Sequence, residues 1–163
     1  MNASEKVIHH FYTCFASKDI KGMQDCYADN ATFNDPAFGE LNAAQVRKMW
    51  EMLIKSGKDM RVEFSNITAD EHHGITDEHS GTADWVAWYT FSVTGNKVVN
   101  RVRASFLIAD GKIIRHHDDF SFYKWARQAL GLPGLLLGWT PFLKKKIHKK
   151  ATSNLRLYMA ANS

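Results

Sequence analysis

The residue types that could carry chemistry fall in two short segments of the chain. Asp35 follows Phe33 at the end of a short β-compatible stretch and precedes Pro36. His116 and Asp118 are two residues apart in a stretch that reads as a strand, so their side chains share one face. A carboxyl group in an apolar pocket has a raised pKa, and two titratable groups facing one pocket can divide acid and base roles. The predicted catalytic residues are therefore Asp35, Asp118 and His116.

Each of these residues also has a plainer interpretation. The segment Asn34-Asp35-Pro36 is typical of a turn, in which the aspartate bonds nearby backbone N–H groups. His116 and Asp118 could form an ordinary polar pair at the edge of a pocket or on a surface. Local sequence alone leaves both alternatives open.

A metal site is the weaker interpretation of the eight histidines. The chain has no H-E-x-x-H or C-x-x-C motif, and the members of its adjacent pairs, 9–10, 72–73 and 116–117, diverge in direction. A third ligand would have to join His116 and Asp118 from elsewhere. Phosphate-cradling glycine loops, dinucleotide fingerprints and nucleophilic triads are also missing from the sequence. We expect neither a metal nor a cofactor.

Length and composition place these residues in one globular domain. The chain has 163 residues, of which 45% are hydrophobic and 23% charged, so it can bury a core without disulfides or metals. Its longest uncharged run, Gln128–Leu143, is interrupted by prolines and glycines and is too short to span a membrane. No signal-peptide pattern is visible, and Cys14 and Cys26 make no disulfide framework. We expect a cytoplasmic protein.

The charge is distributed unevenly along the chain. Residues 1–123 hold 13 Lys/Arg and 17 Asp/Glu, a net of −4, whereas residues 124–163 hold 8 Lys/Arg and no acid, a net of +8. The overall +4 therefore combines a mildly acidic body with a basic C-terminal extension, and the two need separate explanations.

Hydrophobic periodicity predicts helices first and strands afterwards. Ser4 can cap a first helix, a short second one follows Asp19 and buries Tyr27, and Asn42 with Gln45 forms a capping box for the third. A short strand at 31–35 ends at the proline. Four further strands are predicted at 61–68, 83–94, 97–108 and 112–122, with tight turns at 95–96 and 110–111. This order is an α+β domain in which helices cover one face of a curved antiparallel sheet.

Strand parity separates two faces of this sheet. A two-residue turn at 95–96 would place Ala87 opposite Ala104, with Trp85, Tyr89 and Phe106 on the face under the helices. The opposite face carries Trp88, Arg101 and Arg103. An exposed tryptophan beside cations favours a homodimer through that outer face.

Two motifs add a family resemblance to this outline. The segment YADNATFNDP at 27–36 is similar to the F-A-D-D-A-T-x-x-D-P segment of bacterial ketosteroid isomerases. The segment GKIIRHHDDF at 111–120 resembles the closing strand of SnoaL-like polyketide cyclases and limonene-epoxide-hydrolase-like proteins. Both groups belong to the nuclear transport factor 2-like (NTF2-like) superfamily, a cone-shaped α+β fold with a pocket between helices and sheet. The resemblance covers about residues 4–122.

The resemblance implies roles for particular residues. Asp35 falls on the proton-shuttling aspartate of the isomerases, and Asp118 on the acidic position of the last strand in the cyclases and epoxide hydrolases. The isomerases' oxyanion tyrosine and protonated aspartate fall on Phe11 and Ala104. The hydrolases' Arg-x-Asp falls on Val102 and Ala104 in one register and on Arg101 and Arg103 in the other, and neither pair supplies its carboxylate. The residues expected to line a small-molecule pocket are Phe11, Tyr12, Tyr27, Phe33, Trp85, Tyr89, Phe106 and Phe120.

We therefore expect a small-molecule acid/base enzyme, an isomerase, cyclase or hydrolase acting on a compact, mostly apolar, oxygenated substrate. The alternative is a non-catalytic ligand-binding or dimerisation module of the same fold. We divide the chain into an NTF2-like domain, residues 1–122, and an extension, residues 123–163. The extension is expected to pack on that domain or on the dimer partner.

The basic extension is expected to form helices. One should run from 123 to 130, and another should begin at Pro141 after the cap Thr140. Between them, Leu135–Trp139 is too apolar to be left in water. A flap that packs on its own domain or on the partner subunit and closes the pocket is the favoured interpretation, and similar W-A-R-Q-A-L-G and L-L-G-W-T-P-F segments in SnoaL-like proteins support it. An interfacial membrane anchor is less favoured, and no nucleic acid is expected because no recognisable binding module is present.

Overall fold

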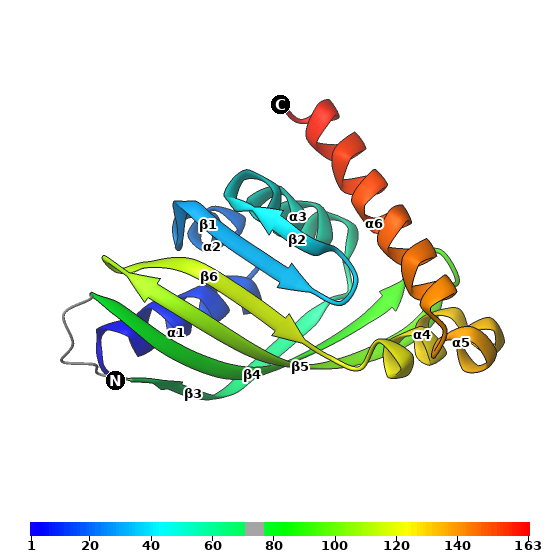
Figure 1. Ribbon diagram of the computed structural model, residues 1–163, viewed down its shortest axis with the longest axis horizontal. Coiled ribbons are helices and arrows are strands. Elements are labelled where there is room, and N and C mark those ends of the chain that lie inside the picture. The colour runs from blue at the N-terminus through cyan, green and yellow to red at the C-terminus, as the bar shows by residue number, and fades with distance from the viewer. Residues whose placement is uncertain (71–76) are drawn as a thin grey trace.

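The computed structural model describes residues 1–70 and 77–163 of the chain. Helices and strands alternate in the first third, strands dominate the middle, and helices close the chain (Figure 1). In chain order the elements are α1 (Ala3–Ala16), α2 (Ile20–Asp25), β1 (Tyr27–Asp35), β2 (Gly39–Asn42), α3 (Ala43–Ser56), β3 (Arg61–Ala69), β4 (Glu78–Phe91), β5 (Asn96–Ala109), β6 (Lys112–Asp119), α4 (Phe122–Leu130), α5 (Leu132–Leu137) and α6 (Pro141–Ala161).

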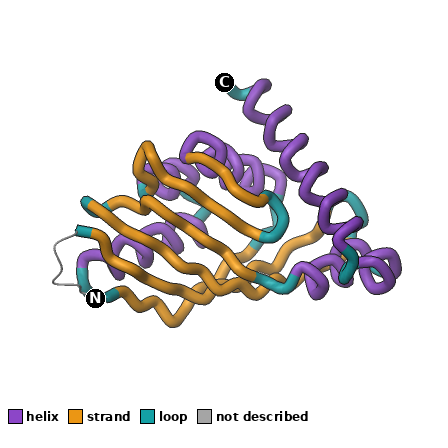
Figure 2. Tube along the Cα trace, in the orientation of Figure 1, coloured by secondary structure: helices purple, strands orange, loops and turns teal. Residues whose placement is uncertain are grey.

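One curved, six-stranded sheet organises the molecule, with strand order β2-β1-β6-β5-β4-β3. Figure 2 shows α1, α2 and α3 gathered on one side of this sheet and the C-terminal helices at one end. The predicted α+β architecture is confirmed. The sheet is not wholly antiparallel, because β6 returns beside β1 in the same direction and pairs with it in parallel. The short strand β2 escaped the sequence analysis, since four residues are too few to show alternation.

Local sequence explains where the covering helices begin. Helix α3 starts with the predicted capping box, in which Asn42 and Gln45 bond each other's backbone N–H groups. Helix α1 starts two residues earlier than predicted, because Asn2 and Glu5 form a second capping box and Ser4 lies inside the helix, buried. Both helices turn aromatic side chains toward the sheet.

The β4–β5 hairpin differs in register from the prediction. Phe91 pairs with Asn96 across a four-residue turn in which Gly95 has a φ of +76°, so Ala87 faces Asn100 and Ala83 faces Ala104. The predicted two-residue turn is therefore wrong. The side chains nevertheless point to the predicted faces, because the pairing shifts by four residues, an even number, and side chains alternate with a period of two.

The buried face of the sheet is the predicted one. Trp85, Phe106 and Phe33 are buried under the helices together with His116 and Asp118. On the outer face, the guanidinium of Arg61 lies 4.2 Å from the centre of the Trp88 ring. Arg103 is paired with Asp84 on that face at 2.7 Å.

The C-terminal helices attach at two places. Helix α4 packs on β5, and the Trp125 indole N–H donates to the Tyr89 hydroxyl at 2.8 Å. Helix α6 lies against the β1–β2 turn and α3, where His148 Nδ1 donates to the Ala37 carbonyl at 3.0 Å. Near its other end the Tyr158 hydroxyl donates to Glu51 at 2.8 Å. Gly39 allows the close approach, because a Cβ there would lie 2.8 Å from the His148 ring.

The segment between these helices is not packed as predicted. Leu135, Leu136, Leu137 and Trp139 are exposed, and residues 132–137 form the short helix α5 in place of a break. Within the single chain these four side chains do not pack on their own domain; the alternative, packing on a dimer partner, stays a prediction. Helix α6 packs on the rest of the molecule through Leu143 and Leu155, which are buried.

Candidate functional site

Asp35 ends β1 and forms the tight turn that its local sequence suggested. One carboxyl oxygen accepts hydrogen bonds from the backbone N–H groups of Ala37 at 2.8 Å and Phe38 at 2.6 Å. Burial raises the pKa of Asp35 to about 6, the Phe38 amide opposes this rise, and the negative charge of Asp118 adds to it. The carboxyl group therefore titrates near neutral pH, where both the acid and the base forms are populated.

A cleft of about 470 Å³ opens beside the β1–β2 turn that contains Asp35. It lies between the β1–β2 turn, the outer side of β6 and the first half of α6. The lining side chains are mostly polar or charged: Asn34, Asp35, His117, Asp119, Lys144, Lys145 and His148, together with Pro36 and Gly39. We call this the Asp35 cleft. Its volume suits a small molecule, and its cations could stabilise a developing negative charge on a substrate oxygen.

His116 and Asp118 lie on the opposite side of the sheet from that cleft, inside the core. Only 1% of His116 and 2% of Asp118 is exposed. The His116 Nε2 atom is 2.9 Å from Asp118 Oδ1, and its Nδ1 atom is 2.7 Å from the Tyr27 hydroxyl. Trp50 donates to that hydroxyl at 2.9 Å, and Trp85 donates to Asp118 at 3.3 Å. These five side chains form the buried polar chain.

One placement of protons satisfies every link in this chain. The Trp50 N–H donates to Tyr27 oxygen, the Tyr27 O–H donates to His116 Nδ1, and the His116 Nε2–H donates to the Asp118 carboxylate. Burial raises the pKa of Tyr27 well above its usual value, which keeps its hydroxyl protonated as this placement requires. In this placement Nδ1 of His116 accepts a hydrogen bond and Nε2 donates one, so both ring nitrogens have partners.

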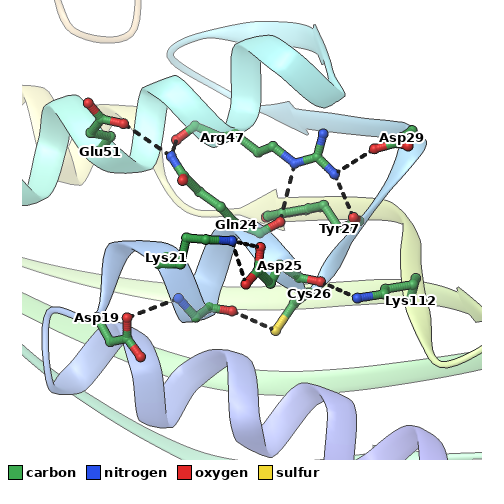
Figure 3. A network of polar contacts seen from close by, with 11 residues as sticks. Asp19, Lys21, Gln24, Asp25, Cys26, Tyr27, Asp29, Arg47, Glu51 and Lys112 are labelled. Atoms are coloured by element: carbon green, nitrogen blue, oxygen red, sulfur yellow. Dashed lines mark hydrogen bonds and ion pairs between the residues drawn. The ribbon is translucent and has the colours of Figure 1, made fainter.

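A separate network fixes the backbone of Tyr27 (Figure 3). The guanidinium of Arg47, on α3, donates to the Tyr27 carbonyl at 2.7 Å, to Asp29 at 3.1 Å and to the Gln24 carbonyl at 3.2 Å. Lys112, at the start of β6, donates to the Asp25 carbonyl. The α2–β1 connection is thereby tied to both α3 and β6, and the Tyr27 ring is held where it reaches His116.

Tyr12 is the exception among the buried polar side chains. It is fully buried on α1, and its hydroxyl has no hydrogen-bond partner among residues 1–70 and 77–163. Burial raises the pKa of Tyr12, and the charge of Asp118 raises it further. A buried hydroxyl without a partner costs about 1–3 kcal/mol, so the fold retains this group at a loss in stability.

The other predicted pocket residues divide into two groups. Phe11, Phe33 and Phe106 surround the His116 ring, with centroids 5.5, 5.1 and 4.4 Å from it. Tyr89 and Phe120 are only half-buried and lie between the main core and a second cluster around Trp125. Aromatic side chains thus fill the space next to the buried polar chain, and the Asp35 cleft contains Asp35 but neither His116 nor Asp118.

Sequence reasoning missed three contributors. Trp50 was assigned only to the apolar stripe of its helix, although an indole N–H that faces a core needs an acceptor. Lys144 and His148 were not assigned to any site, because nothing local predicts that α6 crosses the β1–β2 turn. No three His, Cys, Asp or Glu side chains of the described ranges converge as metal ligands, and His72 and His73 lie outside those ranges.

Solved structures of similar fold include candidate enzymes of several types. A candidate polyketide cyclase from Xanthomonas campestris pv. campestris has a TM-score of 0.60 at 15% identity, covering 77% of this chain and 96% of that one. An epoxide hydrolase of the LEH-like type from M. tuberculosis has a TM-score of 0.59 at 15% identity, with coverages of 83% and 96%. A candidate isomerase from Bacillus subtilis has a TM-score of 0.60 at 17% identity, with coverages of 80% and 96%. At these identities the likeness shows the fold.

No curated protein matches the sequence. The sequence model of the SnoaL-like domain matches residues 8–116, which takes in α1 to β6 up to His116. The chain therefore belongs to the SnoaL-like family.

Proposed function

We propose that the protein is a small-molecule acid/base enzyme, an isomerase, cyclase or hydrolase, in which Asp35 transfers the proton. The observation that carries this proposal is that Asp35, one of the residues lining the Asp35 cleft, has a pKa of about 6. A general base is most effective when its pKa lies near the working pH. The proposed substrate is compact, mostly apolar and oxygenated, with its oxygen toward Lys144 and Lys145.

His116 and Asp118 take a positioning role in this proposal. Neither lines the Asp35 cleft, and every polar atom of the His116 ring is already engaged within the buried polar chain. The fixed charge of Asp118 contributes to the raised pKa of Asp35. Asp118 also stands directly opposite Ala104 on β5, the position at which the ketosteroid isomerases would carry a carboxyl group. A carboxyl group is thus present at the neighbouring position of the sheet.

Exchange of the α-protons of a ketone tests the proposal without knowledge of the natural substrate. We expect the protein to exchange the α-protons of 2-decalone in D2O, monitored by NMR, at a rate that increases as the pH rises through about 6. Asp35→Asn should slow this exchange by at least about 100-fold. Glu40→Gln removes an exposed carboxylate from the adjacent strand and is the matched control, with an unchanged rate expected. Equal rates for the parent and Asp35→Asn would refute the role of Asp35.

A non-catalytic ligand-binding module is the second candidate. The packed aromatic interior and the fully engaged His116 favour it, because neither feature leaves a reactive group pointing at a ligand. The same experiment separates the two candidates. Chemical-shift changes at residues of the Asp35 cleft on adding 2-decalone, without any proton exchange, would favour the binding module.

A further inference from the structure

An exposed apolar surface lies at the end of the molecule away from the N-terminus, around α5 (Figure 1). Among the described residues, nine large hydrophobic side chains are exposed, and six of them lie within residues 132–142. These six are Leu132, Leu135, Leu136, Leu137, Trp139 and Phe142, and we call them the α5 patch. Isolated exposed leucines are ordinary, but a contiguous group of this kind marks an interaction surface.

The patch is held on a fixed scaffold. Gly134 is buried against α4, where a Cβ atom would collide with the Ala126 carbonyl. The Tyr123 hydroxyl donates to the Leu135 carbonyl at 3.3 Å, and the Trp139 indole N–H donates to the Leu136 carbonyl at 3.0 Å. Thr140 then caps α6. The leucines and Trp139 are therefore presented outward by ordered backbone, and they are exposed although the segment itself is packed.

Positive charge surrounds the α5 patch on both sides in the sequence. Lys124 and Arg127 precede it on α4, and Lys144, Lys145 and Lys146 follow it on α6, all exposed. No Asp or Glu occurs after Asp119. Apolar side chains that include a tryptophan, flanked by lysines without any acid, are typical of protein segments that lie in the interface of an anionic membrane.

We propose that the α5 patch and the start of α6 bind the surface of an anionic lipid bilayer. The leucines, Trp139 and Phe142 would enter the boundary between headgroups and acyl chains, and the flanking lysines would contact anionic headgroups. No helix in the described ranges is long and apolar enough to cross a membrane, so the contact is interfacial. This inference rests on the exposed α5 patch rather than on the proposed chemistry at Asp35, although Lys144 and Lys145 also line the Asp35 cleft.

The positive charge around the α5 patch disfavours a second copy of the chain as its binding partner. In a two-fold dimer the same surface faces itself, so the lysines of one copy would approach those of the other. Repulsion between like charges opposes that arrangement, whereas anionic headgroups are attracted. A membrane is therefore the occupant that satisfies both the apolar and the charged parts of this surface.

Co-sedimentation of the full chain with vesicles tests the proposal. We expect binding to vesicles with about 30% phosphatidylglycerol in phosphatidylcholine and at least about tenfold weaker binding to pure phosphatidylcholine. Raising NaCl from about 50 to about 500 mM should weaken the binding, since salt screens the lysines. The double variant Leu136→Ser/Trp139→Ser should bind at least about tenfold more weakly.

The matched control also removes two exposed apolar side chains, but outside the patch. Leu157 and Val93 are 67% and 75% exposed, against 59% and 73% for Leu136 and Trp139. Leu157→Ser/Val93→Ser should bind within about twofold of the parent. Equal loss in both double variants, equal binding to the two vesicle types, or absence of binding by the parent would overturn the proposal. The proposal would also be overturned if light scattering showed a dimer that only Leu136→Ser/Trp139→Ser dissociates, and if this variant still bound vesicles.

Discussion

Asp35 and Asp118 are two carboxylates whose surroundings differ in almost every respect. Asp118 is enclosed in the core, where His116 and Trp85 donate to it. Asp35 sits in a turn at the edge of a cleft, accepts hydrogen bonds from two backbone amides and has a pKa of about 6. On the proposed function, the buried carboxylate holds structure, whereas the half-buried one exchanges protons with a ligand.

The largest expected effect comes from removing the buried carboxylate. Asp118→Leu leaves the N–H groups of His116 and Trp85 without an acceptor in the core, so we expect it to lower the free energy of unfolding by about 3 kcal/mol. Urea denaturation followed by circular dichroism measures this change. Asp118→Asn keeps an acceptor oxygen and should lose only about 1 kcal/mol.

The adjacent residue Asp119 provides the control for this comparison. Asp119 is exposed on the opposite face of β6, so Asp119→Asn should change the free energy of unfolding by less than about 0.5 kcal/mol. If Asp118→Leu were as mild as Asp119→Asn, the buried polar chain would not be the stabilising network described above.

Tyr27→Phe removes the link between Trp50 and His116. The Trp50 N–H and His116 Nδ1 would both lose their buried partner, and we expect a loss of about 2 kcal/mol in the free energy of unfolding. The pKa of Asp35, measured by NMR in the same variant, should stay near 6, because Tyr27 is not among the groups that shift it. A large fall of that pKa would mean that the two carboxylates are coupled through the buried chain.

Asp35→Asn should increase the free energy of unfolding, in contrast to the substitutions in the buried polar chain. The folded protein raises the pKa of Asp35 from its ordinary value to about 6, so the free energy of unfolding falls as the pH rises from about 4 to about 6 and stays lower above that. Replacement by the neutral amide should therefore increase the free energy of unfolding at pH 7.5, by about 1–2 kcal/mol. The gain should disappear below about pH 4, where the aspartate is protonated in both folded and unfolded chains. A variant less stable than the parent at pH 7.5 would contradict this account.

Strand alternation was enough to predict which side chains face the core. Trp85, Phe106, His116 and Asp118 were placed correctly because a period of two tolerates the register error at the β4–β5 turn. Tyr27 was expected to end a helix, yet it begins β1 and reaches His116. Its contact depends on the parallel pairing of β1 with β6, which brings together residues 89 positions apart.

The C-terminal extension was the least predictable part. Helices α4 and α6 were recognised from the glycine at 131 and from Thr140 and Pro141, which are local signals, whereas α5 was missed. Where α6 lies depends on long-range contacts, such as that of His148 with the β1–β2 turn, and no periodicity encodes these. For the same reason the sequence could not indicate that Leu135, Leu136, Leu137 and Trp139 are exposed.

The pKa of Asp35 is the measurement that tests the central claim most directly. Titration of the chain labelled with 13C at the aspartate carboxyl groups, with Asp35→Asn to assign the resonance, should give a midpoint near pH 6. A second titration with 2-decalone bound to the Asp35 cleft should move that midpoint, because the ligand would exclude water from the carboxyl group. A midpoint at or below about 4, unchanged by the ligand, would show that Asp35 is only a turn residue and would contradict the account.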